Sequence, residues 1–235
     1  MNELNPRTLR WCAWSGPVLI VVFSAGLIPL ARFFPPPSPT SGSQQIAQMY
    51  AEHATPIRIG CLVMVIGLVF LVPWGAGIAM ATRRAEAGLP ILGHTQVASV
   101  AMSTALIVLI PTTWALAAFR PGEIAPDVTR TVNDFGWFLL LFAWPPFSIW
   151  NVAIALAIFA DKSERPLFPR WSGYLCLWDA VLLAPGGLMA FFKTGPFAWN
   201  GIMAFYVPLS VFFVWMIGMT VVLLRISRTV EERAG

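Results

Sequence analysis

The sequence predicts an all-α fold, a transmembrane helix bundle of about six spans with both termini in the cytoplasm. Apolar residues make up 57% of the 235 residues and charged residues 11%, about half the charge of an average globular protein. The apolar residues gather in long runs, and about 20 of them are needed to cross the roughly 30 Å hydrocarbon core of a bilayer. Lys and Arg favour alternate connections between these runs, as they do in multi-pass membrane proteins.

The runs divide the chain into one transmembrane domain, residues 1–235, without room for a separate soluble domain. The first run follows Arg7 and Arg10 as in a signal peptide, but it is too long for one, and we expect a retained helix. Spans are expected at residues 11–31, 57–82, 91–119, 135–160, 171–192 and 202–226, followed by a cytoplasmic tail at residues 227–235. The largely aromatic connection at residues 193–201 is expected in the interface or as a re-entrant segment, and five spans remain the alternative.

Two polar segments flank these runs. Residues 32–56 form an outer loop that opens with stiff prolines and continues into a short amphipathic helix, with Ile46, Met49 and Tyr50 on one apolar stripe. We expect this helix on the membrane surface or as a lid over the bundle. Asn133 and Asp134 are expected to cap the fourth span.

The orientation follows from the basic residues. With six spans and the N-terminus inside, five basic residues face outward, and they are Arg32, Arg58, Arg120, Arg130 and Lys193. Ten face the cytoplasm, and they are Arg7, Arg10, Arg83, Arg84, Lys162, Arg165, Arg170, Arg225, Arg228 and Arg233. This asymmetry is the one that orients membrane proteins.

Asp179 is the acid that lies well inside an apolar run. An ionisable group at the centre of a membrane helix costs at least about 2.5 kcal/mol and is by default a candidate site. It predicts a proton or cation site or a polar contact for a ligand. The structural alternative is a neutral carboxyl that bonds a neighbouring helix. Its candidate partners are Asn151, Ser148, Trp178 and Trp144.

The segment Pro185-Gly186-Gly187 interrupts the same span. Proline removes a backbone hydrogen bond and glycine relaxes the chain, so a break is expected there. Transporters build sites from broken helices. We therefore count these three residues as candidate ligand-binding residues, together with Asp179, Asn151, Ser148 and Trp178. Prolines lie in or near most of the other spans too, and kinked helices also pack without a cavity.

The sequence does not favour a catalytic, metal, cofactor or nucleic-acid site. No histidine is expected near Ser15 or Ser172, so no catalytic residues are predicted. His53 and His94 are expected at opposite membrane faces, and the cysteines show no metal-binding spacing, so we predict neither a metal nor a cofactor. The net charge of +4 reports orientation rather than nucleic-acid binding. The many Trp and Phe residues suit a ring-lined pocket, although plain packing is the preferred interpretation.

The chain also resembles a family of uncharacterised bacterial integral membrane proteins. The segments that carry the resemblance are Phe168-Pro-Arg-Trp-Ser-Gly-Tyr174, Pro185-Gly-Gly187, Phe191-Phe-Lys-Thr-Gly-Pro-Phe-Ala-Trp-Asn-Gly201, Pro37-Ser-Pro-Thr40 and Ile57-Arg-Ile-Gly60. The resemblance implies the bacterial inner membrane and brings no activity or site residue.

Two functions remain from the sequence. The first is a small permease or binder of an apolar or aromatic molecule, with Asp179 as a protonatable contact. The second is a non-catalytic subunit or scaffold of a larger membrane assembly, in which Asp179 bonds across a helix interface and partner membrane subunits and lipid surround the chain. An enzyme is the third, less favoured class.

Overall fold

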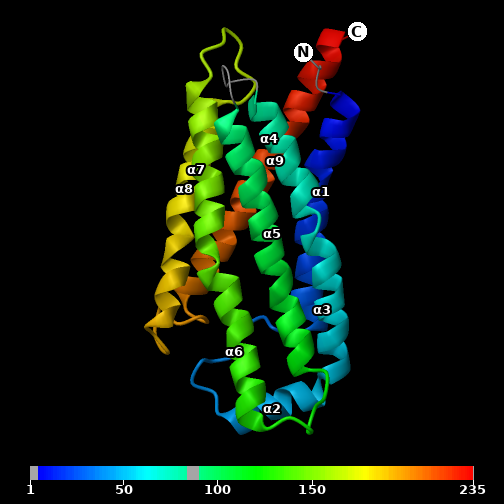
Figure 1. The fold of residues 1–235 in the computed structure, drawn as a ribbon, viewed down its shortest axis with the longest axis vertical. Coiled ribbons are helices and arrows are strands. Elements are labelled where there is room, and N and C mark those ends of the chain that lie inside the picture. The colour runs from blue at the N-terminus through cyan, green and yellow to red at the C-terminus, as the bar shows by residue number, and fades with distance from the viewer. Residues whose placement is uncertain (1–4, 84–89, 235) are drawn as a thin grey trace.

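The bundle is entirely helical where the structure describes it. The computed structural model describes residues 5–83 and 90–234, and no strand occurs among them. The helices run along the long axis of the molecule, and α1 begins at the same end at which α9 finishes (Figure 1). We call this the terminus end, and we call the opposite end, which α2 crosses, the lid end.

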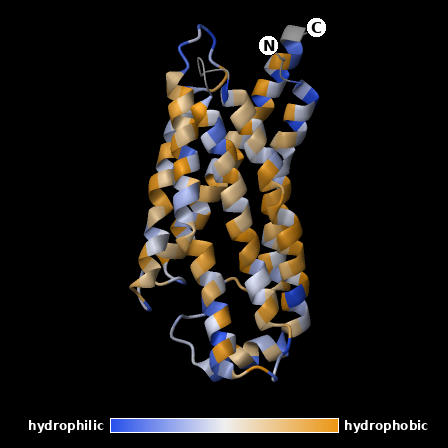
Figure 2. Ribbon diagram, viewed as in Figure 1, coloured by the Kyte–Doolittle hydropathy of each residue, from blue (hydrophilic) through white to orange (hydrophobic). Residues whose placement is uncertain are grey.

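Six helical segments are long and apolar enough to cross a membrane, over the described residues. They are α1 (Pro6–Ala25) with η1 (Gly26–Leu30), α3 (Ala54–Leu68) with α4 (Leu71–Thr82), α5 (Ile91–Ala117), α6 (Pro126–Phe142) with α7 (Trp144–Ala160), α8 (Arg170–Leu182) with η3 (Ala184–Ala190), and η4 (Ile202–Tyr206) with α9 (Val207–Ala234). Hydrophobic residues colour the length of the bundle, and hydrophilic residues gather at its two ends (Figure 2). The predicted all-α bundle is confirmed, and the chain is a multi-pass membrane protein.

Three boundaries differ from the sequence predictions by five residues or more, and the first of them is the start of the first span, which lies at Pro6 rather than at residue 11. The fourth span begins at Pro126 rather than at residue 135, because proline suits the first turn of a helix and Asp127 favours its positive end. Asn133 and Asp134 therefore lie within α6, and the prediction that they cap the fourth span was wrong. The last helix continues to Ala234, so the expected tail is helical through that residue.

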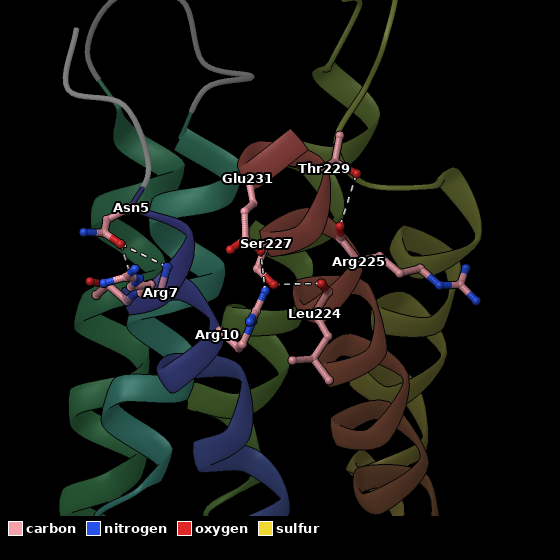
Figure 3. A network of polar contacts seen from close by, with 9 residues as sticks. Asn5, Arg7, Arg10, Leu224, Arg225, Ser227, Thr229 and Glu231 are labelled. Atoms are coloured by element: carbon pink, nitrogen blue, oxygen red, sulfur yellow. Dashed lines mark hydrogen bonds and ion pairs between the residues drawn. The ribbon is translucent and has the colours of Figure 1, made fainter. Parts of the chain in front are cut away.

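The extended end of α9 packs beside the start of α1 (Figure 3). Asn5 caps α1 by accepting hydrogen bonds from the backbone N–H groups of Arg7 and Thr8. Arg10 Nη2 lies 2.6 Å from Glu231 Oε2, which joins the first and last helices. Both side chains are about half exposed, so the pair adds at most about 1 kcal/mol of stability.

Four spans pass from one helical segment to the next with a proline in the first turn of the second segment, and we call each such junction a break. Three of these breaks contain one or two residues outside the helices, and at the fourth η4 passes into α9 without a gap. The breaks fall after α3, α6, α8 and η4, and the prolines are Pro73, Pro145 with Pro146, Pro185, and Pro208. Proline lacks the N–H that would continue the preceding helix, whereas a first turn does not need that donor. The break predicted at Pro185 is confirmed, and η3 follows it.

The amphipathic helix predicted in the first loop is α2 (Ser43–Glu52), and it lies across the lid end (Figure 1). Of the expected stripe, Ile46 and Tyr50 are buried and Met49 is half-buried, so α2 is a lid on the bundle. The hydroxyl of Tyr50 donates to Asn133 Oδ1 of α6 over 3.1 Å. Beside it, Trp199 Nε1 donates to the carbonyl of Pro37 over 2.7 Å and ties the connection at residues 193–201 to the first loop.

A cluster of buried rings lies beneath α2. We call it the lid cluster, and it consists of Phe33, Tyr50, Trp114, Trp137 and Phe205. The Trp114 ring centroid is 4.8 Å from both the Phe33 and the Trp137 centroids. Tilted and edge-on ring pairs of this kind contribute about 0.5–1.5 kcal/mol each beyond burial. The lid cluster therefore anchors the first loop to α5, α6 and η4.

The lid predicts a pH dependence of stability. Burial raises the pKa of Tyr50 well above its usual value of 10. Below pH 10 the phenol is protonated in both folded and unfolded chains, so its contribution to stability is complete. Above pH 10 the phenol ionises first in the unfolded chain, and its contribution to stability is lost as the pH rises.

Tyr50→Phe should lower the free energy of unfolding by about 1–3 kcal/mol at pH 8, because Asn133 Oδ1 loses its donor. The variant should also lose less stability than wild type when the pH is raised above 10. Thermal unfolding at pH 8 and above pH 10 measures the two effects, with the exposed Tyr174→Phe as control. An unchanged alkaline profile would contradict the assignment.

Candidate functional site

Asp179 is fully buried on α8 and bonded to one neighbouring side chain. Asn151 Nδ2 of α7 donates to Asp179 Oδ2 over 2.9 Å and to the carbonyl of Phe147 over 3.1 Å. Asp179 Oδ1 and Asn151 Oδ1 have no hydrogen-bond partner among the described residues. Of the candidate partners named from the sequence, Asn151 is the one that the structure brings to Asp179.

Ser148 reaches the same helix but not the acid. Its hydroxyl donates to the carbonyl of Ala180 over 2.8 Å. Ser148 lies three residues before Asn151 on α7, so the two side chains point along one face of that helix toward α8. We call the residues Ser148, Asn151, Asp179 and Ala180 the α7–α8 seam. The seam holds the two helices together through two side-chain hydrogen bonds.

The other predicted site residues lie elsewhere. Trp178 is 47% exposed on the outer surface of α8. Pro185, Gly186 and Gly187 lie in η3, beyond the break. A methyl group on Gly186 would lie 3.0 Å from the Leu141 carbonyl oxygen, and one on Gly187 would lie 2.6 Å from Trp144 Nε1. The two glycines therefore let η3 approach the junction of α6 and α7 closely.

A cavity of about 100 Å³ lies at that junction, and we call it the central cavity. All of its walls are apolar, and none of the seam residues lines it. The lining residues are Leu19 and Phe23 of α1, Leu68, Ile107, Ile110, Leu140, Leu141, Ala143, Trp144, Phe147, Leu183, Phe205, and Pro208, Leu209, Phe212 and Phe213. Asp179 thus lies behind the cavity wall rather than within it.

The helix breaks converge on the central cavity. Leu68 ends α3, Ala143 separates α6 from α7, and Leu183 separates α8 from η3, and all three line it. Pro208, in the first turn of α9, lines it as well. Residues at or next to four breaks, from four different spans, thus lie around one apolar space.

Aromatic clusters border the cavity on two sides. Phe205 belongs to the lid cluster and lines the cavity. On the other side, Trp74, Trp150 and Trp215 form a core tryptophan cluster, with ring centroids 4.9–5.8 Å apart. Phe212 lies 5.6 Å from Trp215 and also lines the cavity. Aromatic rings thus line the central cavity at two of its sides.

The core tryptophan cluster is packed rather than open. Trp74 Nε1 donates to Thr220 Oγ1 over 2.9 Å, and Trp215 Nε1 contacts Cys176 Sγ at 3.3 Å. Cys176 lies one turn before Asp179 on α8. All three tryptophans are fully buried, so they are part of the bundle interior, as the preferred interpretation of the aromatic residues expects.

A second hollow adjoins the central cavity, and we call it the side groove. It has a volume of about 220 Å³ and lies between the η1 end of α1 and the η4 end of α9. It is lined by Ser24, Leu27, Ile28, Phe34, Tyr206, Leu209, Ser210 and Phe213. Leu209 and Phe213 line both spaces and form the wall between them.

Neither hollow has a metal-binding character. Among the described residues, no group of three His, Cys, Asp or Glu side chains could hold a metal ion. His53 immediately precedes α3 at the lid end, whereas His94 lies in the first turn of α5 at the terminus end. The apolar cavity and the groove are the candidate site.

No protein family model matches the chain, and no curated protein or solved structure is similar to it. The resemblance to bacterial membrane proteins stays a prediction from the sequence.

The α7–α8 seam gives a testable prediction about Asp179. Asn151→Leu should destabilise the protein by about 1–3 kcal/mol, because Asp179 then has no partner. The double change Asn151→Leu with Asp179→Leu should recover most of that loss, since both polar groups are then gone. Unfolding in mixed detergent micelles measures each free energy, with Ser148→Ala as the matched control. A double variant that is less stable than either single variant would contradict the pairing.

Proposed function

We propose that this chain is a bacterial inner-membrane protein that binds a small apolar or aromatic molecule in its central cavity, as a small permease or carrier does. The observation that carries the proposal is the convergence of four helix breaks on one apolar space. Binding sites in membrane transporters are commonly formed by discontinuous helices near the middle of the bilayer. Largely apolar walls and a preformed shape are typical of small-molecule sites.

The volume of the central cavity is close to the volume that one small ring needs. An apolar cavity of about 150 Å³ holds benzene. The central cavity, with about 100 Å³, has room for a ring only if its walls relax slightly. Phe205, Phe212 and Trp144 in its lining give an aromatic ligand ring edges and faces to pack against.

Asp179 has an indirect part in this proposal. The sequence suggested it as a direct protonatable contact of the ligand, but it bonds Asn151 and lies outside the cavity lining. Through the α7–α8 seam, Asp179 holds α7 against α8 next to the segments of both helices that line the cavity. It therefore supports the wall formed by Phe147 and Leu183.

A non-catalytic subunit of a larger membrane assembly is the second candidate. The α7–α8 seam favours it, because Asp179 finds a partner within the chain and needs no ligand to explain it. On this hypothesis the cavity is a packing defect at the helix breaks, and the outer faces of the helices meet lipid or partner subunits.

Charge supports an orientation with the terminus end in the cytoplasm. Among the described residues, the connections on the lid-end side of the spans and the helix turns next to them contain Arg32, Arg58, Arg120, Arg130 and Lys193. Those on the terminus-end side contain Arg7, Arg10, Arg83, Lys162, Arg165, Arg170, Arg225 and Arg228. The excess at the terminus end matches the positive-inside rule.

The orientation is tested by fusing reporters to the chain in a bacterial host. Green fluorescent protein at the C-terminus should fluoresce, because it folds in the cytoplasm. Alkaline phosphatase inserted at Gly122 should be active, because this residue lies in the α5–α6 turn at the lid end. Phosphatase activity at the C-terminus and none at Gly122 would overturn the orientation.

Binding is tested with toluene on protein in lipid nanodiscs. A ligand that binds the folded state alone adds about 2.7 kcal/mol at a hundred times its Kd, so toluene should raise the unfolding temperature. Ala143→Leu fills the cavity and should abolish the shift, whereas the lipid-facing Ala105→Leu on α5 should keep it. Equal shifts in all three proteins would mean that toluene acts through the bilayer. No shift in folded wild type would favour the subunit hypothesis.

A further inference from the structure

The side groove differs from the central cavity in its lining residues, because three of them carry a hydroxyl group. Ser24 of α1, Tyr206 of η4 and Ser210 of α9 line it together with apolar residues. None of these hydroxyls takes part in a hydrogen bond within the described part of the chain. A hydroxyl without a partner in an apolar environment costs free energy, so three of them around one hollow point to a polar group that fits there.

The groove and the central cavity are neighbours. Leu209 and Phe213 line both. Phe205 lines the cavity and Tyr206 lines the groove, and their ring centroids lie 5.1 Å apart at a right angle. A movement of the Leu209 and Phe213 side chains would join the two spaces, and side chains of this kind change rotamer rapidly compared with helix movements.

The groove opens on the side of the bundle. Ile28 is 45% exposed and Phe34 is 40% exposed, and Ser210 is exposed as well. Ile28, Phe34 and Ser210 lie at the outer surface of the bundle, and lipid covers this surface in a multi-pass membrane protein. A molecule dissolved in the bilayer therefore reaches the groove without crossing water.

Among the residues that the structure describes, no charged side chain lines either space. A charged ligand would lose its hydration there without gaining an opposite charge, which costs far more than the burial of a neutral polar group. The walls thus select a neutral molecule with an apolar body and a small polar end.

We infer that the ligand is an uncharged amphiphile that enters from the bilayer through the side groove. Its ring occupies the central cavity, and a hydroxyl or carbonyl group at its other end bonds Ser24, Tyr206 or Ser210. This inference rests on the proposed function, because it names the chemical class of the same ligand and the route by which it arrives.

The test compares 4-propylphenol with propylbenzene, which differ by one hydroxyl. Apparent Kd values are measured from thermal stabilisation in phosphatidylcholine nanodiscs and corrected for the partition of each probe into the lipid. Wild type should bind the phenol about two- to tenfold more tightly, as one hydrogen bond predicts. Ser24→Ala with Ser210→Ala should reduce this preference, and Tyr206→Phe added to that pair should remove it.

The matched control is Ser15→Ala with Ser227→Ala. These serines lie on the same two helices, α1 and α9, but at the terminus end, where their hydroxyls bond the carbonyls of Trp11 and Leu224. This variant should keep the wild-type preference. Loss of the preference in the control as well would show that the hydroxyls near the groove are not its cause, and the inference would be overturned.

The outcomes also separate this inference from the proposed function. If neither probe stabilises folded wild type, the proposed binding function fails. If both probes bind wild type with equal affinity, the function stands and the inference about a polar end fails. If the triple variant keeps the full preference for the phenol, the polar end is recognised outside the groove, and the inference fails in that case too.

Discussion

The bundle depends on a constraint that the bilayer imposes, which is that backbone N–H and C=O groups need partners from the chain itself. Prolines, which cannot supply one of these partners, occur in each of the six spans among the described residues. Pro17 and Pro111 lie inside α1 and α5, whereas in the other four spans a new helical segment starts, so that the proline falls in a first turn where no donor is needed. A residue at or next to each break lines the central cavity, whereas the α3–α4 break also exposes Val69.

This solution has a packing consequence. Helices that run past one another without interruption fill the space between them, whereas four interrupted helices leave the central cavity. The lid cluster closes one side of that space, and the core tryptophan cluster closes another. Large rigid rings cannot collapse into a gap as flexible aliphatic chains do, so the cavity persists between them. The α7–α8 seam adds polar bonds behind the wall and fixes the distance between the two helices that border it.

Much of the fold could be predicted from the sequence, because the length of an apolar run reports directly on a membrane span. The start of the fourth span was missed because Thr129, Asn133 and Asp134 look like loop residues until α2 covers them. Asn151 was a correct candidate partner of Asp179, since both lie at similar depth. Trp178 was not, because neighbouring residues in a helix point about 100° apart. The cavity could not be predicted, because each proline signals a break in its own helix and only the folded bundle shows that the breaks meet.

The pairing of α1 with α9 has a consequence for biosynthesis. The first helix leaves the ribosome long before its partner, since roughly 170 residues separate them and chains elongate at about 5–20 residues per second. For roughly 10 to 35 seconds, the face of α1 that carries Gly16 and Ser24 has no α9 to pack against. Gly16 fits closely against Trp74 and Thr220, and Thr220 is synthesised near the end. The insertion machinery or surrounding lipid must therefore shelter this face until the sixth span arrives and closes the bundle.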